Sequence, residues 1–367
     1  MESLEKRITN YFNYIVHNGL NLQDGQFVEI VGSSYVKNYI ELIKEACLNA
    51  GASFVYVKYT DGDELQYKIS NGYHNYILDD IKYYQYLINK KFTRIVLTSP
   101  FTIPLSLNKN DILEYKNCQR DLAFVNDYFK NLESQRTIVS IANCYWAAKL
   151  QITENELWER ILSFQNKSAN MDKSWLDSLN IKKLKFETNL GTNLSVELTD
   201  DFKFQNKYLT TKDGIIFEPN IPCLEIYTAP IKYGVNGILY SSKPLYYKGN
   251  IIDNYYVKFK DGHVIDQTLG DLIMLDDTMY YAGEIALVNL FDKTNYYATI
   301  LNENTGCHLA LGYAYEYGIS DLRLINSSDH HVDLVFGDES TNCIGITKNG
   351  EKIILFKDGK YVGKTYD

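Results

Sequence analysis

The sequence predicts an α/β N-terminal domain with a parallel sheet, residues 1–180, and a β-rich α+β C-terminal domain, residues 181–367. Two observations predict this fold class. The first half alternates short apolar strands with amphipathic helices, which is typical of βαβ units. The second half contains short alternating segments separated by Gly, Asn and Asp turns, which is typical of antiparallel sheets.

Residues 26–59 carry the clearest local pattern. The apolar run QFVEIVGSS is followed by YVKNYIELIKEACLNAG, whose apolar residues recur at helical spacing up to Gly51. The next segment, SFVYVKY, alternates as a strand does. A strand, a helix and a strand of these lengths form a βαβ unit with parallel pairing and a right-handed crossover. Two later segments, residues 92–100 and 137–144, are predicted as further buried strands.

The VGSS segment after the first strand is not a nucleotide-binding loop. It has a single Gly and contains neither GxGxxG nor GKS/T. We interpret it as a simple strand-to-helix turn and assign no cofactor to it.

In the second half, turn tripeptides recur between the predicted strands. They occur in LGTN, TKDG, YKGN, FKDG, TKNG and a second FKDG. Glycine adopts positive φ without strain, so these segments predict hairpin turns rather than a sequence repeat.

Composition limits the classes of function. With 45% hydrophobic and 23% charged residues, the chain is typical of a globular protein. A net charge of −9 argues against a general nucleic-acid binder. We find no apolar run of the ~18 residues that a membrane span requires and no signal peptide. The six cysteines form no CxxC pair, which predicts reduced thiols and a cytoplasmic protein.

Two histidines and an aspartate are candidate metal ligands. His331 and Asp333 are two residues apart in HHVDLVFG, so on a strand they share one face. His330 then points to the other face. His308 lies where the polar segment ENTG changes to the apolar run LALG. A His and an Asp at this spacing are, by themselves, more often a hydrogen-bonded pair than metal ligands.

Two glutamates lie in apolar segments. Glu225 is in PNIPCLEIYTAP and Glu284 is in YAGEIALVNL. Burying an unpaired carboxylate is costly, so each needs a cation, a hydrogen-bond donor or a metal. The alternative is that both lie at strand ends and face solvent.

Five ordered blocks carry a family resemblance. They are PNIPCLEIYTAP, SSKPL, AGEIALV, ENTGCHLALGYAY and HHVDLVFG. Together they resemble the signature blocks of the M29 metallo-aminopeptidases, the thermophilic-type aminopeptidases of bacteria. The resemblance is close over residues ~180–340. It is looser in the first half, where NCYWAAKL and ELWERIL resemble the family's WAxK and LWE segments.

The resemblance implies a site with two divalent metal ions. Its ligands would be Glu225, Glu284, His308, Tyr315, His331 and Asp333. Such oxygen and imidazole ligands suit Zn²⁺, Co²⁺, Mn²⁺ or Mg²⁺. The chain departs from the family where Leu224-Glu225 replaces the usual Glu-Glu, and it is shorter between the blocks, which puts substrate specificity in doubt.

The implied activity is the removal of N-terminal residues from short peptides by a metal-activated water. Glu225, Glu284 and Tyr315 are the candidate catalytic residues. Either glutamate would bridge the ions, and Tyr315 would lie near the substrate carbonyl if the stretch after His308 is helical. Cys307 is interpreted as a packed thiol. The resemblance also implies a homodimer in which the first domain helps enclose the active site.

Two other functions remain open from the sequence. His308, His331 and Asp333 alone form the two-His-one-carboxylate set of a mononuclear Fe(II) ring-cleaving dioxygenase. The glutamate pair favours the peptidase, because one iron does not need it. A catalytically inactive binding homologue is the third possibility, and five retained polar residues argue against it.

Overall fold

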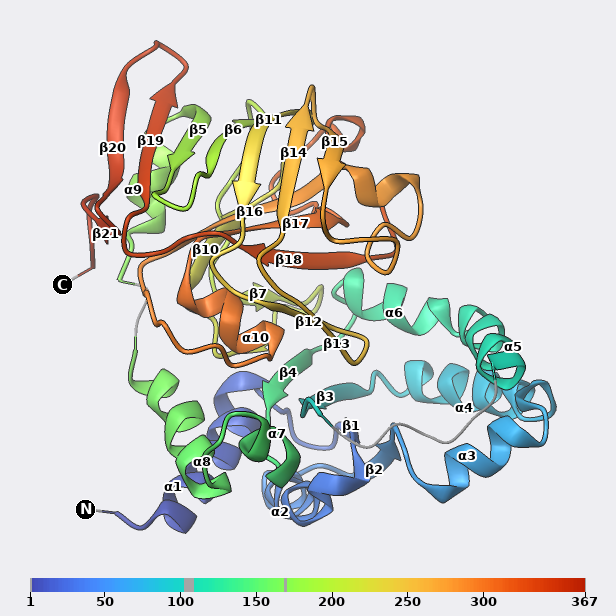
Figure 1. Ribbon diagram of the computed structural model, residues 1–367. Helices are drawn as coiled ribbons and strands as arrows, with labels where there is room; N and C mark the ends of the chain where they lie inside the picture. Colours follow the sequence, from blue (N-terminus) through green and yellow to red (C-terminus); the bar gives the residue numbers. More distant parts are fainter. Residues whose placement is uncertain (1, 102–108, 168–169, 367) are drawn as a thin grey trace. The chain divides into compact units, whose positions relative to one another are not determined.

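The chain folds into two compact units in a computed structural model that describes residues 2–101, 109–167 and 170–366 (Figure 1). Unit 1 comprises Met1–Asn166 and Tyr208–Pro222, and unit 2 comprises Lys167–Lys207 and Cys223–Asp367. Unit 1 is built on a parallel sheet with helices, whereas unit 2 is built on antiparallel sheets. The predicted fold class is therefore confirmed.

The sheet of unit 1 is parallel throughout, with the strand order β2-β1-β3-β4-β9. Its last strand comes from the segment Tyr208–Pro222, which returns to unit 1 after the first strands of unit 2. The strands are β1 (Phe27–Gly32), β2 (Phe54–Tyr59), β3 (Thr93–Thr98), β4 (Arg136–Ser140) and β9 (Asn220–Ile221). The same segment forms a small hairpin of β7 (Leu209–Thr210) and β8 (Ile216–Phe217).

Two helix ends in unit 1 show how the sequence stops or starts a helix. Helix α2 ends as predicted at Gly51, whose φ is +97°, and Ala52 N–H donates to the Cys47 carbonyl oxygen as in a Schellman motif. Helix α8 begins with a capping box formed by Thr153 and Glu156. The helices are α1 (Leu4–Tyr14), α2 (Lys37–Asn49), α3 (Asp63–Ser70), α4 (Ile77–Asn89), α5 (Lys109–Arg120), α6 (Ala123–Lys130), α7 (Cys144–Lys149) and α8 (Glu154–Ser163).

Unit 2 contains a large antiparallel sheet with the strand order β15-β14-β11-β6-β5-β19-β20-β21. Its strands are β5 (Ile181–Glu187), β6 (Asn193–Leu198), β11 (Pro230–Tyr240), β14 (Tyr256–Lys260), β15 (His263–Gln267), β19 (Asn342–Thr347), β20 (Lys352–Lys357) and β21 (Lys360–Tyr361). Helix α9 (Lys173–Ser178) precedes this sheet in the chain, and β12 (Leu245–Tyr247) pairs with β13 (Asn250–Ile252) in a separate hairpin.

A second, four-stranded antiparallel sheet in unit 2 has the order β10-β16-β17-β18 (Figure 1). Its strands are β10 (Glu225–Thr228), β16 (Ala282–Val288), β17 (His308–Gly312) and β18 (His331–Val335). The short helix α10 (Thr299–Asn302) and a 3-10 turn, Glu303–Thr305, lie between β16 and β17 in the chain.

The core of unit 2 joins its two main sheets. Ile285 and Leu309 of the small sheet belong to one buried cluster with Leu184, Val196 and Val257 of the large sheet. Side chains alternate between the two faces of a strand. Because Ile285 and Leu309 face the core, the residues next to them in each strand lie on the other face of the small sheet.

Several predicted turns are observed as tight hairpins. Each of three joins antiparallel neighbours through two residues that both have positive φ, as a type I′ turn requires: Lys248-Gly249, Asp261-Gly262 and Asp358-Gly359.

Membrane-spanning helices are not found in the described part of the chain, where every helix falls short in length or in apolar character.

We predict that two hairpin glycines differ in their tolerance of alanine. At Gly249 a Cβ meets nothing within 4 Å, so Gly249→Ala should cost only the left-handed strain of about 1–2 kcal/mol. At Gly262 a Cβ would lie 2.0 Å from the Lys232 carbonyl oxygen, so Gly262→Ala should cost about 3 kcal/mol or more. Urea unfolding of both variants measures the difference, and equal losses would contradict the clash.

Candidate metal centre

Except for Tyr315, the candidate ligands from the sequence lie on the four strands of the small sheet. Glu225 begins β10, Glu284 lies in β16, and His308 begins β17. His331 and Asp333 lie in β18. These residues are far apart in the sequence, and they come together because the four strands are neighbours in one sheet.

The strand register aligns these residues on one face. Glu284 pairs with Ala310, which pairs on its other side with Asp333, so the three form one row across the sheet. His331 pairs with Gly312 in the adjacent row. The residue between Glu284 and Asp333 in this row is Ala310, whose side chain is a single methyl group.

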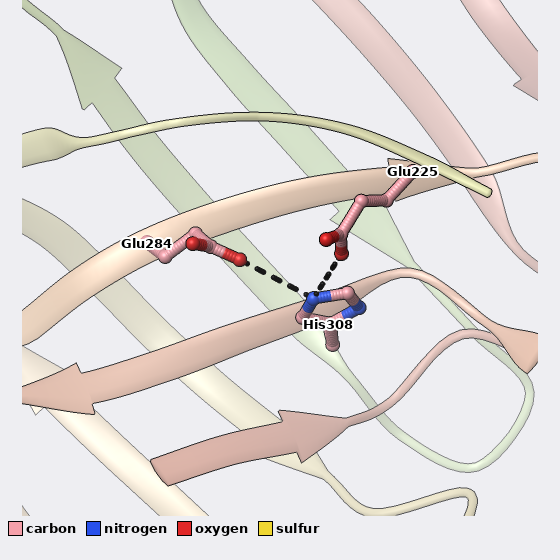
Figure 2. Close-up of side chains that lie close together, drawn as sticks. All are labelled: Glu225, Glu284 and His308. Carbon is pink, nitrogen blue, oxygen red and sulfur yellow. Dashed lines mark ion pairs between the residues drawn. The ribbon is translucent and has the colours of Figure 1, made fainter. Parts of the chain in front are cut away.

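Side-chain donor atoms of Glu225, Glu284 and His308 lie close together on this face of the sheet (Figure 2). The Nε2 atom of His308 lies 2.9 Å from Oε2 of Glu225 and 3.3 Å from Oε1 of Glu284. All three residues are buried.

A second group of donors lies beside the first. The Nε2 atom of His331 lies 3.1 Å from Oδ1 of Asp333 and 4.0 Å from Oε2 of Glu284. Glu284 therefore belongs to both groups and offers a different carboxylate oxygen to each. His330, which was predicted to point to the other face of the strand than His331, lies outside both groups. Its Nε2 is 3.7 Å from Oδ2 of Asp276.

Backbone carbonyls orient both imidazoles. Nδ1 of His308 lies 3.3 Å from the carbonyl oxygen of Gly306, and Nδ1 of His331 lies 2.9 Å from that of Tyr313. An Nδ1–H that donates to a carbonyl leaves Nε2 as the ligand atom, which is the usual arrangement of metal-binding histidines. In both cases Nε2 faces the carboxylates.

The carboxylates dominate the electrostatics of the site. Burial opposes a charged imidazole, but the hydrogen bonds that His308 donates to Glu225 and Glu284 raise its pKa well above the usual value. Burial also lowers the pKa of His331, but the charge of Asp333 and its hydrogen bond with the imidazole outweigh burial and raise this pKa to about 10. Burial raises the pKa of Glu284, and neighbouring carboxylates add to this effect. The site therefore attracts positive charge, as a proton or as a metal cation.

The donor spacing fits a divalent ion. Ligands bound at 2.0–2.2 Å in tetrahedral geometry lie ~3.3 Å apart. The separations of 2.9 Å and 3.3 Å around His308 and of 3.1 Å between His331 and Asp333 are close to this value. Two imidazoles and three carboxylates, without a thiolate, suit hard or borderline divalent ions.

Tyr315 lies near the site, although the stretch that leads to it is not a helix. Residues after His308 form β17 up to Gly312, because the apolar run alternates between the core and the open face of the sheet. The helical stretch on which the expected position of Tyr315 was conditional is therefore not present. The Tyr315 ring is nevertheless 5.3 Å from the imidazole of His331 and 5.7 Å from the ring of Tyr227.

Cys307 is a packed thiol, as expected. It is fully buried, and burial raises its pKa to about 11. The neighbouring Cys223 lies close to the metal centre and its thiol donates to Oε1 of Glu225 over 3.6 Å.

Sequence reasoning missed two residues in the turn before β17. Glu303 is 6% exposed and its carboxyl forms a side-chain hydrogen bond with Asp333. Burial and the carboxylates of Asp333 and Glu225 raise the pKa of Glu303 well above its usual value. Asn304 accepts a hydrogen bond from the backbone N–H of Leu224 and so connects this turn to β10. The only sequence signal was the polar segment ENT ahead of His308.

Comparison with known proteins shows the family of this chain. A family model described as thermophilic metalloprotease (M29) matches residues 4–361. The chain belongs to the M29 metalloprotease family. This membership confirms the resemblance found in the sequence blocks and implies a divalent metal in this family member.

Relatives in the M29 family match along almost the whole chain. Aminopeptidase AmpS of Bacillus subtilis (strain 168) is 27% identical, with 98% of this chain and 100% of the relative covered. Aminopeptidase 2 of Geobacillus stearothermophilus is 28% identical, with 98% and 99% covered. The solved structure of wild-type AmpT from Thermus thermophilus superposes with a TM-score of 0.83 at 21% identity, covering 98% of this chain and 100% of that one, which supports the fold.

We predict that the small side chain at Ala310 is needed for metal binding. Ala310→Val places two methyl groups between Glu284 and Asp333, so metal affinity should fall roughly 10- to 100-fold. Ala46→Val adds the same volume at a buried position of α2 in unit 1 and should leave the affinity unchanged. Calorimetric titration with Zn²⁺ or Co²⁺ measures both, and equal affinities would contradict this account of the site.

Proposed function

We propose that this M29 family member is a metal-dependent aminopeptidase that removes N-terminal residues from short peptides. We further propose that it uses two divalent ions, Zn²⁺, Co²⁺, Mn²⁺ or Mg²⁺. One observation carries the proposal: Glu284 offers one oxygen to the group with Glu225 and His308 and the other to the group with His331 and Asp333. Two three-donor groups that share a carboxylate have the ligands that a dinuclear site needs.

The proposed roles follow from the contacts of each residue. Glu225 and His308 would hold one ion, His331 and Asp333 the other, and Glu284 would bridge them. When bound, such ions act as Lewis acids and lower the pKa of a coordinated water. Tyr315 is proposed as a further ligand or as a hydrogen-bond donor to the substrate carbonyl oxygen, because its ring packs against His331.

The contacts of the histidines favour this function over a single-iron dioxygenase. One iron would need His308, His331 and Asp333 around the same point. His308 instead faces Glu225 and Glu284, and the two histidines belong to different donor groups. A binding protein without catalysis would have no use for this buried set of charged groups.

The cellular setting and the assembly are part of the same proposal. We propose a cytoplasmic homodimer whose catalytic residues lie in unit 2. Six free cysteines, five of them buried, support a reducing compartment. Light scattering coupled to size-exclusion chromatography measures the mass, and a monomer would contradict the dimer.

Metal removal tests the proposed activity. After chelation, the protein should lose nearly all hydrolysis of leucyl- and aspartyl-p-nitroanilide, because the proposed ions lower the pKa of the attacking water and polarise the substrate carbonyl. Added Co²⁺, Zn²⁺ or Mn²⁺ should restore the activity. Full activity without metal would contradict the proposal, as would a protein that binds one iron, consumes oxygen with a hydroxylated pyridine and cleaves no aminoacyl substrate.

A matched pair of histidine variants tests the ligand set. His331→Ala removes the imidazole that faces Asp333 and Glu284, so metal content should fall and kcat/KM should drop by more than about 100-fold. His330→Ala removes the adjacent imidazole, which lies outside both groups, and should retain both. Glu225→Gln should behave like His331→Ala. Full peptidase activity in either ligand variant would show that the residue assignment is wrong.

A further inference from the structure

The large sheet of unit 2 has an outer face that is turned away from the core. Leu184 and Phe186 of β5 belong to the buried core cluster. Lys183 and Lys185 alternate with them along the strand, so they lie on the outer face. The strands β5, β19 and β20 are neighbours toward one end of this sheet (Figure 1). The part of the outer face that they form carries an unusual set of side chains.

Three isoleucines are neighbours on this part of the outer face. Ile344 of β19 pairs directly with Ile354 of β20, and Ile346 lies two residues further along β19. Ile354 is 52% exposed, and the other two are half-buried. The same strands contribute Cys343 and Phe356 to the core instead. Single exposed apolar residues are ordinary, whereas a contiguous group of them marks an interaction surface.

Lysines border these isoleucines on both sides. In the strand register, Lys185 of β5 pairs with Ile344. Ile346 lies between Lys183 of β5 and Lys352 of β20. Neighbouring strands are ~4.8 Å apart, so the strands that carry these lysines are separated by ~10 Å. We call this surface the isoleucine–lysine face; it consists of Lys183, Lys185, Ile344, Ile346, Lys352 and Ile354.

The charge of this region is opposite to that of the whole chain. The strands β5, β19 and β20 carry five lysines and one glutamate, a net charge of +4, whereas the chain carries −9. Lys183 forms an ion pair with Glu197 of β6. Lys185 and Lys352 have no such partner among the residues that the structure describes. Their ammonium groups are therefore available to carboxylates of another molecule.

The dimensions of the isoleucine–lysine face match an α-helix. β19 has six residues and is therefore ~20 Å long, which is the length of ~13 helical residues. A helix is ~10 Å wide, so a helix that lies along β19 would place side chains over both β5 and β20. We propose that this face is a docking surface for an acidic amphipathic helix of a partner protein. The apolar stripe of the helix would cover the isoleucines, and carboxylates on both flanks would meet the lysines.

Other occupants fit this face less well. In a two-fold contact between copies of this chain, each copy would place its lysines against the identical lysines of the other, and like charges oppose such a contact. Lysine at the edge of a sheet discourages the pairing of identical strands for the same reason. Nucleic acid is disfavoured by the net charge of −9 and by the apolar centre of the face.

The isoleucine–lysine face is separate from the metal centre. The inner face of the large sheet packs against the small sheet, and the metal ligands lie on the other face of the small sheet. A helix bound to the outer face of the large sheet would contact none of the proposed ligands. The inference therefore goes beyond the proposed function and does not depend on it.

Two designed peptides test the docking surface by fluorescence anisotropy. One labelled helical peptide carries a leucine stripe flanked by glutamates, and a matched peptide carries lysines in place of the glutamates. The full-length protein should bind the acidic peptide at least about 10-fold more tightly, and added salt should weaken this binding. Because the whole chain is negative, non-specific attraction would favour the basic peptide instead. Equal binding of the two peptides, or no saturable binding of the acidic one, would overturn the proposal.

Charge-reversal variants locate the binding site. Lys185→Glu combined with Lys352→Glu reverses the charge on both sides of β19 and should weaken the acidic peptide at least about 10-fold. Ile344→Thr keeps a β-branched residue on the strand and should also weaken it. Lys258→Glu makes the same charge change on the outer face of β14, four strands from β19, and should leave the affinity unchanged. Circular dichroism checks that all variants keep the fold, and undiminished binding by the double lysine variant would show that the surface is wrong.

Two further measurements separate the partner helix from other occupants. If the double lysine variant converts a dimer into a monomer in light scattering, the face joins two copies of this chain. If the face binds vesicles of phosphatidylcholine and phosphatidylserine through its lysines but does not bind the acidic peptide, it contacts a membrane surface. Either result would contradict the proposed partner.

Discussion

The alternation of side chains across the four-stranded sheet is the constraint on which the site depends. Ile285 and Leu309 point into the core shared with the large sheet, so Glu284 and His308, one position away in each strand, face the opposite side. A shift of one residue in any strand would bury a charged group in the core. Packing of the apolar face therefore fixes the register, and the register fixes the distances between the donors.

The second constraint is electrostatic. Several buried carboxylates lie together around two imidazoles, and such an arrangement is costly unless cations neutralise it. The hydrogen bonds from both Nδ1 atoms to backbone carbonyls turn the Nε2 atoms toward the acids. The small side chain of Ala310 lies between Glu284 and Asp333 in the strand register. Charge and space together favour metal ions over an internal salt-bridge network.

The turn before β17 contacts two parts of the metal centre. Asn304 binds the backbone at Leu224, next to Glu225, while Glu303 lies against Asp333. One short segment thus contacts both outer strands of the sheet, β10 and β18.

The sequence by itself determined the local elements and the family. The spacing of His331 and Asp333 predicted a shared strand face, and the order of the blocks indicated the M29 family, because both depend on nearby residues or linear order. Only the tertiary structure decided that Glu284 lies between two donor groups and that Glu303 lies against Asp333. Strand order and cross-strand register bring these residues together, and such long-range pairing depends on packing of the whole core rather than on local sequence.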